Sequence, residues 1–139
     1  MQFVDTNILL YAVSGDTRDE EKSAIAETLL EGTDLALSVR VLQEFYTQAT
    51  RSTRIHRLSH DAANGLIELW LRFPIQEMTV EILLAALKAS QRFQISYWDA
   101  AIIEAARALA CREILSEDLN AGQNYAGVRV VNPFAKKRK

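Results

Sequence analysis

The sequence predicts an α/β protein in which a parallel sheet is covered by helices on both faces. Short apolar segments recur along the 139-residue chain. Between them lie longer segments in which apolar residues return every three or four positions, as on one face of a helix. This alternation is typical of a parallel sheet, because each connection between parallel strands carries a helix across one face.

The first half of the chain supplies two strands and two helices. Residues 1–4 form the first predicted strand, and residues 16–31 form a helix that Gly32 ends. Residues 35–37 form the second strand, and Ser38 is the expected cap of the next helix. The apolar positions of that helix are Val41, Leu42, Phe45, Tyr46 and Ala49.

The second half continues the pattern. Ser59, Thr79 and Ser96 are expected helix caps, and the helix after Ser96 runs to about Ala110. The helix after Thr79 carries one apolar face, made of Val80, Leu83, Leu84 and Leu87. A brief strand is expected near Ile75, and two more at residues 113–116 and 128–131.

Length and charge limit the organisation of the chain. A chain of 139 residues builds one domain with a real core. We assign residues 1–135 to that domain and residues 136–139 to a basic tail. The formal net charge is −2, so nucleic acid must be bound by local basic patches.

The expected location is the cytoplasm. Cys111 is the single cysteine, which excludes an intrachain disulfide and suits a reducing compartment. It follows apolar residues and is expected to be buried. No apolar segment is long enough to span a membrane, and the N-terminus lacks the basic start of a signal peptide.

Acidic residues at unusual places suggest a functional site. Asp5 and Asp118 each follow a predicted strand, and ligands of open α/β sheets bind beyond the carboxyl ends of strands. A buried carboxylate is costly without a partner, so such acids suggest a bound cation. Asp5 also suits a helix cap, and Asp118 lies among turn-forming residues.

A third acid, Asp99, falls within an apolar helical stripe. The stripe consists of Ile102, Ile103, Ala106 and Ala110. A capping box with Ser96 explains the spacing of Asp99 but not its place on the apolar face. Asp99 can act both as part of the capping box and as a residue of the site. Glu44 lies on the far flank of its helix, where the pattern alone indicates a solvated residue.

Four segments in this order carry a resemblance to a known family. The chain resembles a PIN domain, and most of all the VapC-type ribonuclease toxins of toxin–antitoxin pairs. The resemblance covers nearly the whole chain. The four segments are residues 3–7 (FVDTN), 38–46 (SVRVLQEFY), 97–102 (YWDAAI) and 116–123 (SEDLNAGQ).

The resemblance implies a three-layer α/β/α sandwich with a five-stranded parallel sheet. It implies that four acids are catalytic and bind Mg²⁺ or Mn²⁺, namely Asp5, Glu44, Asp99 and Asp118. It places supporting polar groups at Thr6, Asn7 and Ser116. Glu117 stands beside Asp118 as an alternative for the fourth acid. The resemblance also implies a homodimer and a cognate antitoxin protein.

The expected activity is endonucleolytic hydrolysis of RNA phosphodiesters by a metal-activated water. Carboxylate oxygens suit Mg²⁺ or Mn²⁺, and the bound ion lowers the pKa of its water. An acidic pocket repels RNA, so a basic rim should attract it. The candidate rim residues are Arg40, Arg51, Arg54 and Arg57. His56 and His60 lie in the same basic stretch, away from the acid motifs.

Other interpretations stay open. A PIN fold can act as a catalytically silent RNA-binding module, although the intact acid set disfavours it. A haloacid-dehalogenase-like phosphatase needs a second aspartate where this chain has Asn7, and a receiver-like domain needs a lysine after a late strand. An arginine from an antitoxin could enter the acidic pocket. The apolar residues at 41–46 and 66–70 either form a groove for a partner helix or fill the core.

Overall fold

The computed structural model describes residues 1–135, and the basic tail assigned to residues 136–139 lies outside the described residues. The strands form a sheet in the order β3-β2-β1-β4-β6-β5. Their bounds are β1 (Gln2–Val4), β2 (Leu35–Ser38), β3 (Ile75–Gln76), β4 (Glu113–Leu115), β5 (Asn124–Tyr125) and β6 (Val128–Val131).

The sheet has six strands where five were expected. The five predicted strands pair in parallel, from β3 through to β6. The sixth, β5, runs antiparallel to β6 at the edge of the sheet. The two residues between them, Ala126 and Gly127, have φ values of 54° and 99°. Two successive positive φ values make the tight turn of a two-residue hairpin, and the Ala-Gly pair is a weaker sequence signal for it than Asn-Gly.

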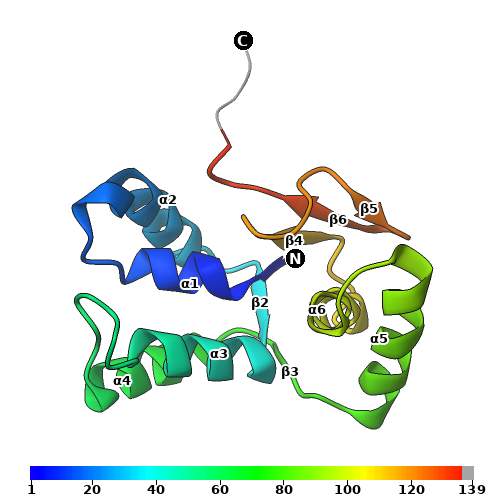
Figure 1. Cartoon of the computed structure of the whole chain (residues 1–139), viewed down its shortest axis with the longest axis horizontal. Coiled ribbons are helices and arrows are strands. Elements are labelled where there is room, and N and C mark those ends of the chain that lie inside the picture. The colour runs from blue at the N-terminus through cyan, green and yellow to red at the C-terminus, as the bar shows by residue number, and fades with distance from the viewer. Residues whose placement is uncertain (136–139) are drawn as a thin grey trace.

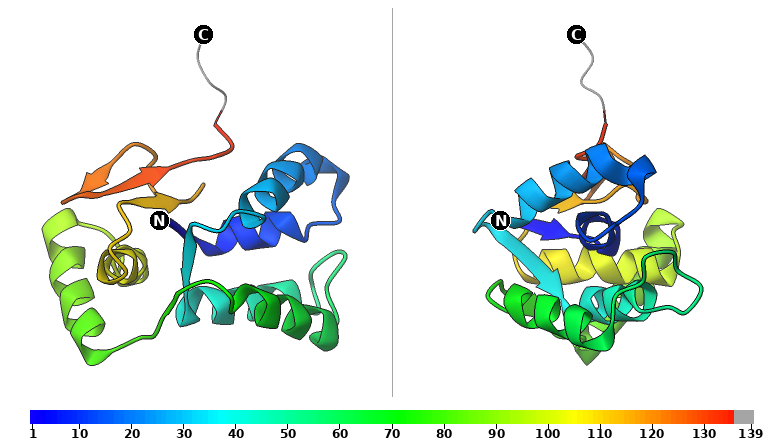
Figure 2. Two further views of the ribbon diagram at one scale, coloured as in Figure 1. Left: turned by 180° about the vertical axis from the view of Figure 1, so that it is seen from behind. Right: turned by 90° about the vertical axis from the view of Figure 1, so that its left-hand side faces the viewer.

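Helices cover both faces of the sheet, as predicted. Their bounds are α1 (Thr6–Ala12), the 3₁₀ turn η1 (Thr17–Asp19), α2 (Glu20–Leu30), α3 (Val39–Ala49), α4 (His60–Trp70), α5 (Val80–Phe93) and α6 (Tyr97–Ala108). Figures 1 and 2 show α1 to α4 on one side of the strands and α5 and α6 on the other. None of these helices has the length and apolarity that a membrane crossing requires.

Four predicted caps start four of the helices. The hydroxyl oxygens of Ser38, Ser59, Thr79 and Ser96 each accept a hydrogen bond of 3.1 Å from the backbone amide three residues later. Each such cap contributes about 1 kcal/mol relative to alanine. Because α3 and α6 carry Glu44 and Asp99, the caps also fix where these two acids lie.

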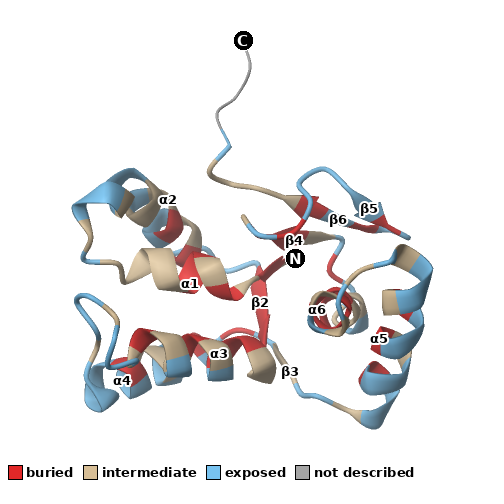
Figure 3. Ribbon diagram, in the orientation of Figure 1, coloured by how far each residue is buried: buried red, intermediate tan, exposed pale blue. Residues whose placement is uncertain are grey.

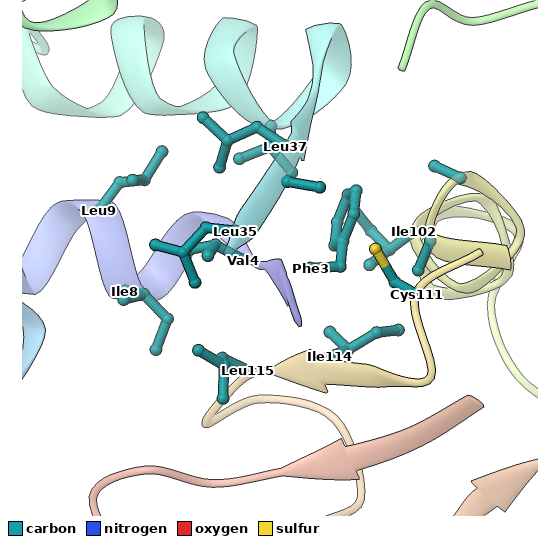
Figure 4. Close-up of a cluster of buried hydrophobic side chains, with 14 of the residues drawn as sticks. Phe3, Val4, Ile8, Leu9, Leu35, Leu37, Ile102, Cys111, Ile114 and Leu115 are labelled. Carbon is teal, nitrogen blue, oxygen red and sulfur yellow. The ribbon is translucent and has the colours of Figure 1, made fainter. Parts of the chain in front are cut away.

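The core lies between the sheet and its helices. Figure 4 shows Phe3 and Val4 of the central strand β1 among apolar side chains from both layers. Burial is concentrated on the strands and on the helix faces turned toward them (Figure 3). Cys111 is buried among these residues, as expected.

Of the two roles considered for the apolar residues at 41–46 and 66–70, the structure favours the core for most of them. Val41, Leu42 and Phe45 are buried, and Trp70 packs edge-on against Phe45 with ring centroids 4.8 Å apart. These residues belong to the core because α3 packs against β2 and α4 packs against α3. Leu69 is the one large apolar side chain between residues 66 and 70 that is exposed.

The open apolar face lies on α5 instead. Its large residues are exposed, with Val80 at 68%, Leu84 at 54% and Leu87 at 49%. The opposite face of α5 packs small residues against α6 in a second buried cluster, made of Ala86, Ala89, Ala100 and Ala101. The four alanines let the two helices approach closely, so the larger leucines of α5 point outward.

Candidate active site

The predicted site residues gather at the carboxyl ends of the central strands. Asp5 follows β1, and Asp118 lies in the loop after β4, the strand beside β1. Glu44 comes from the second turn of α3 and Asp99 from the first turn of α6. These carboxylates from four separate segments line one pocket of about 270 Å³. The sheet order reverses at β1, which is where ligands of open α/β sheets bind.

Asp5 has two structural roles at once. Its Oδ1 atom accepts a hydrogen bond of 2.7 Å from the backbone amide of Thr6, so it caps α1. Its Oδ2 atom accepts a hydrogen bond of 2.7 Å from the hydroxyl of Ser116. Ser116 is fully buried and directly follows β4, so this bond fixes Asp5 relative to the neighbouring strand. The cap and the pocket position are therefore compatible.

Asn7 connects the acids of the two strand ends. Its amide nitrogen donates to Asp118 Oδ2 at 3.1 Å and to Ser116 Oγ at 3.2 Å, with a long contact of 3.5 Å to Asp5 Oδ2. Its amide oxygen accepts a bond of 3.2 Å from the backbone of Glu117. The amide nitrogen thus stands between two carboxylates and partly offsets their repulsion.

Glu44 is held by both of its carboxylate oxygens. The hydroxyl of Thr6 donates to Oε2 at 3.2 Å, and the amide of Gln48 donates to Oε1 at 3.0 Å. Gln48 lines the pocket but was missed from the sequence. The signal that could have identified it is its position four residues after Glu44, because such pairs meet on a helix surface.

Asp99 is the least constrained of the four acids. Its backbone amide donates to Ser96 Oγ at 3.1 Å, which is one half of the expected capping box. Within residues 1–135, its carboxylate has no hydrogen bond to Ser96 or to another residue, so the other half is not formed. Asp99 is half-buried and lines the pocket together with Ile102 of the same helical face. The carboxylate is therefore available to a ligand.

Glu117 is held away from this pocket. Its carboxylate accepts a hydrogen bond of 2.6 Å from Tyr11 and pairs with Lys22 at 2.5 Å. It lines a separate pocket of about 210 Å³ that also contains Arg54. Asp118 lines both pockets, so Asp118 and not Glu117 lines the pocket of Asp5, Glu44 and Asp99.

Burial and mutual repulsion act on the Asp5 carboxyl group. Burial raises its pKa to about 6, and the nearby carboxylates of Asp118 and Glu44 contribute to the rise. The hydrogen bonds from Ser116 and from the Thr6 amide oppose this rise. A cation in the pocket would relieve the repulsion and favour the ionised form of Asp5.

The donor set suits a hard cation that retains water. Among the described residues, no three acidic, histidine or cysteine side chains are close enough to hold an ion together. Mg²⁺ is usually held by one or two carboxylates, and water and substrate phosphate complete its shell. Four carboxylates around one pocket, two of them linked by Asn7, fit that mode of binding.

Two of the four candidate rim arginines lie at the site. Arg40 lines the acidic pocket, and Arg54 lines the adjoining pocket, which shares Asn7, Leu10 and Asp118 with the first. Arg51 and Arg57 are exposed and line neither pocket. The two pockets are therefore neighbours, and each has one arginine in its lining.

Sequence and structure comparisons agree on the type of domain. The model of the PIN domain family matches residues 3–125. No curated protein sequence matches the chain.

Several solved structures share the fold at low identity. A toxin–antitoxin complex from Klebsiella pneumoniae gives a TM-score of 0.70 at 20% identity, over 96% of this chain and 98% of that one. VapC20 of Mycobacterium tuberculosis, a Sarcin-Ricin loop cleaving toxin, gives 0.65 at 21% identity, over 85% and 92%. FitAcB from Neisseria gonorrhoeae gives 0.61 at 20% identity, over 96% and 98%.

Proposed function

Because the chain belongs to the PIN domain family, we propose that it is a metal-dependent endoribonuclease and the toxin of a toxin–antitoxin pair. The similar structures support this, since they include toxin–antitoxin complexes and a toxin that cleaves the Sarcin-Ricin loop. The observation that carries the proposal is the convergence of Asp5, Glu44, Asp99 and Asp118 on one pocket. We assign the four acids as catalytic residues that form the site for Mg²⁺ or Mn²⁺, with one or two of them in direct contact with the ion, in a cytoplasmic protein.

The chain itself contributes a preorganised acidic pocket. Thr6 and Gln48 orient Glu44, Asn7 orients Asp118, and Ser116 orients Asp5. When bound, the ion would lower the pKa of a water and polarise a phosphoryl oxygen of RNA. Asp5 must lose its proton to hold a cation, so metal affinity should rise with pH through about 6.

Cleavage assays test this proposal directly. Purified protein incubated with RNA and Mg²⁺ or Mn²⁺ should cut the RNA, and EDTA should stop the reaction. Binding of RNA without any cleavage, in every metal tried, would favour the catalytically silent RNA-binding module. Release of phosphate from small phosphomonoesters without RNA cleavage would favour the phosphatase interpretation.

The acidic pocket also suits an inhibitory antitoxin. One similar structure is a toxin–antitoxin complex, and others are FitAB and VapBC proteins bound to DNA. A partner arginine that enters the pocket would form a bidentate pair with a carboxylate, through two parallel hydrogen bonds. We propose a cognate antitoxin that inhibits cleavage in this way, and a synthetic peptide from a neighbouring reading frame would test it.

We further propose a homodimer that covers the apolar face of α5. Leu84 and Leu87 lie on that face, and burying one leucine contributes roughly 1.5–3 kcal/mol. Leu84→Glu should therefore weaken dimerisation by about tenfold or more. Analytical ultracentrifugation at micromolar concentration would measure the change.

The control is Leu69→Glu on α4, because Leu69 is 57% exposed and lies outside the α5 face. It should leave the dimer intact. A wild-type protein that remains monomeric, or a dimer that Leu84→Glu leaves unchanged, would contradict this assignment of the α5 face.

A further inference from the structure

Trp98 is the large aromatic side chain at the rim of the acidic pocket. It lies in the first turn of α6, directly before Asp99, and lines the same pocket. It is 57% exposed, whereas Trp70 is only 3% exposed. Tyr97 contacts it edge-on, with ring centroids 5.0 Å apart. An aromatic surface therefore adjoins the four acids and remains open to a ligand.

Arg40 lies over the ring of Trp98. The carbon of its guanidinium group is 4.2 Å from the ring centroid, which is a cation–π contact. Four carboxylates line the same pocket, yet Arg40 forms no hydrogen bond or ion pair through its side chain with a residue in the described part of the chain. Its N–H donors therefore remain available to a phosphate.

We propose that Trp98 and Arg40 form a subsite for one nucleotide of single-stranded RNA beside the acidic pocket. A base stacks on the face of the indole opposite Arg40, and Arg40 binds an adjacent phosphate. Every base has an aromatic face, so the stacking tolerates different sequences. Bases in a duplex are already stacked, so an unpaired nucleotide is preferred. The substrate class rests on the proposed nuclease function, but binding can be measured without cleavage.

Tryptophan fluorescence can report on this subsite. The chain has two tryptophans. Trp70→Phe retains a ring that packs against Phe45 and leaves Trp98 as the only tryptophan emitter. Adding Asp118→Asn slows cleavage, so binding can be followed with Mg²⁺ present. A single-stranded oligoribonucleotide should quench Trp98 emission, whereas an abasic strand of the same length should quench it far less.

Affinities of substituted proteins provide the second measurement. In the Asp118→Asn background, Trp98→Ala should weaken binding of the oligoribonucleotide by roughly 5- to 150-fold, the usual range for one stacked base. Trp98→Phe should restore part of that loss, because a smaller ring remains. Leu69→Ala is the control, since Leu69 is 57% exposed, as Trp98 is, but lies on α4 outside the pocket. It should leave the affinity unchanged.

The outcomes separate this subsite from the nuclease proposal. Quenching and the Trp98→Ala loss in a protein that never cuts RNA would support the subsite and reject the nuclease. A second outcome is that wild type cleaves RNA, but RNA does not quench Trp98 emission and Trp98→Ala does not weaken RNA binding. That outcome would overturn the subsite and leave the nuclease proposal standing. If Trp98→Ala dissociates a dimer while RNA affinity is unchanged, Trp98 belongs to a subunit interface and the subsite is wrong.

Discussion

Asp99→Asn should reduce RNA cleavage by at least about 100-fold while the protein stays folded. The carboxylate of Asp99 forms no hydrogen bond with the residues around it in the described structure, and it lines the pocket with the other acids. Its loss should therefore cost little stability but remove one acid from the cation site. Loss of even an indirect partner of a metal ligand costs roughly 10–100-fold. Initial cleavage rates at saturating Mg²⁺ or Mn²⁺ measure the effect.

Two matched variants control for charge and position. Asp61→Asn also removes an acid from the first turn of a helix, but Asp61 is exposed on α4 and lies outside the pocket. Glu117→Gln removes the acid next to Asp118, which Tyr11 and Lys22 hold in the neighbouring pocket. Both variants should retain nearly full activity. Full activity in Asp99→Asn, or in wild type with EDTA, would reject the metal mechanism.

Local chemistry made much of the fold predictable. Ser38 and Ser96 were identified as caps because a hydroxyl before an apolar helical pattern is a strong start signal. Asp5 and Asp118 could be placed at one sheet edge, because the carboxyl ends of parallel strands lie at the same edge of a sheet. Each of these predictions depends on a few neighbouring residues and on one general rule of sheet topology.

The place of Glu44 could not be derived in that way. Periodicity measures how apolar residues gather on one helix face, and Glu44 lies on the flank of its face. In the structure that flank faces Thr6 and the pocket, which forms where segments distant in sequence meet. Family resemblance supplied this residue because it encodes the assembled site rather than a local pattern.

For α5, periodicity identified the large apolar residues but not which face of the helix is buried. The pattern emphasises its large residues, yet Leu84 and Leu87 are exposed, and Ala86 and Ala89 pack against α6. Small residues permit close approach of two helices but contribute little to an apolar pattern. The sequence therefore revealed that α5 has an apolar face without showing which face the monomer buries.

Asp5→Asn should remove a pH-dependent loss of stability from the metal-free protein. The folded pKa of Asp5 is about 6, above its ordinary value of 3.8. Well below pH 3.8 the carboxyl group is protonated in both states, so its contribution to stability is fully present. As pH rises through 6 that contribution is lost, because ionisation then costs about 3 kcal/mol more in the folded state.

The change in stability with pH is the measurement. In Asp5→Asn the side-chain amide oxygen can still cap α1, but the amide nitrogen cannot accept the hydrogen bond from Ser116, which costs about 1 kcal/mol. The stability of the variant relative to wild type should nevertheless rise between pH 4 and pH 7, in urea titrations with EDTA. Asp61→Asn should follow wild type at each pH. A constant difference between Asp5→Asn and wild type would reject the burial effect on Asp5.

At pH 7.5 without metal, Asp5→Asn should be more stable than wild type, and Mn²⁺ should reverse that order. A ligand that binds only the folded state stabilises it by about 2.7 kcal/mol at 100 times its Kd. Wild type, whose ionised Asp5 is destabilising without a cation, should gain several degrees in Tm with Mn²⁺, at roughly 2–4 °C per kcal/mol. Asp5→Asn should gain much less, because the neutral amide replaces one of the carboxylates that repel one another in the empty pocket. Equal gains in both proteins would mean that the ion binds elsewhere, even if the pH dependence follows the expectation.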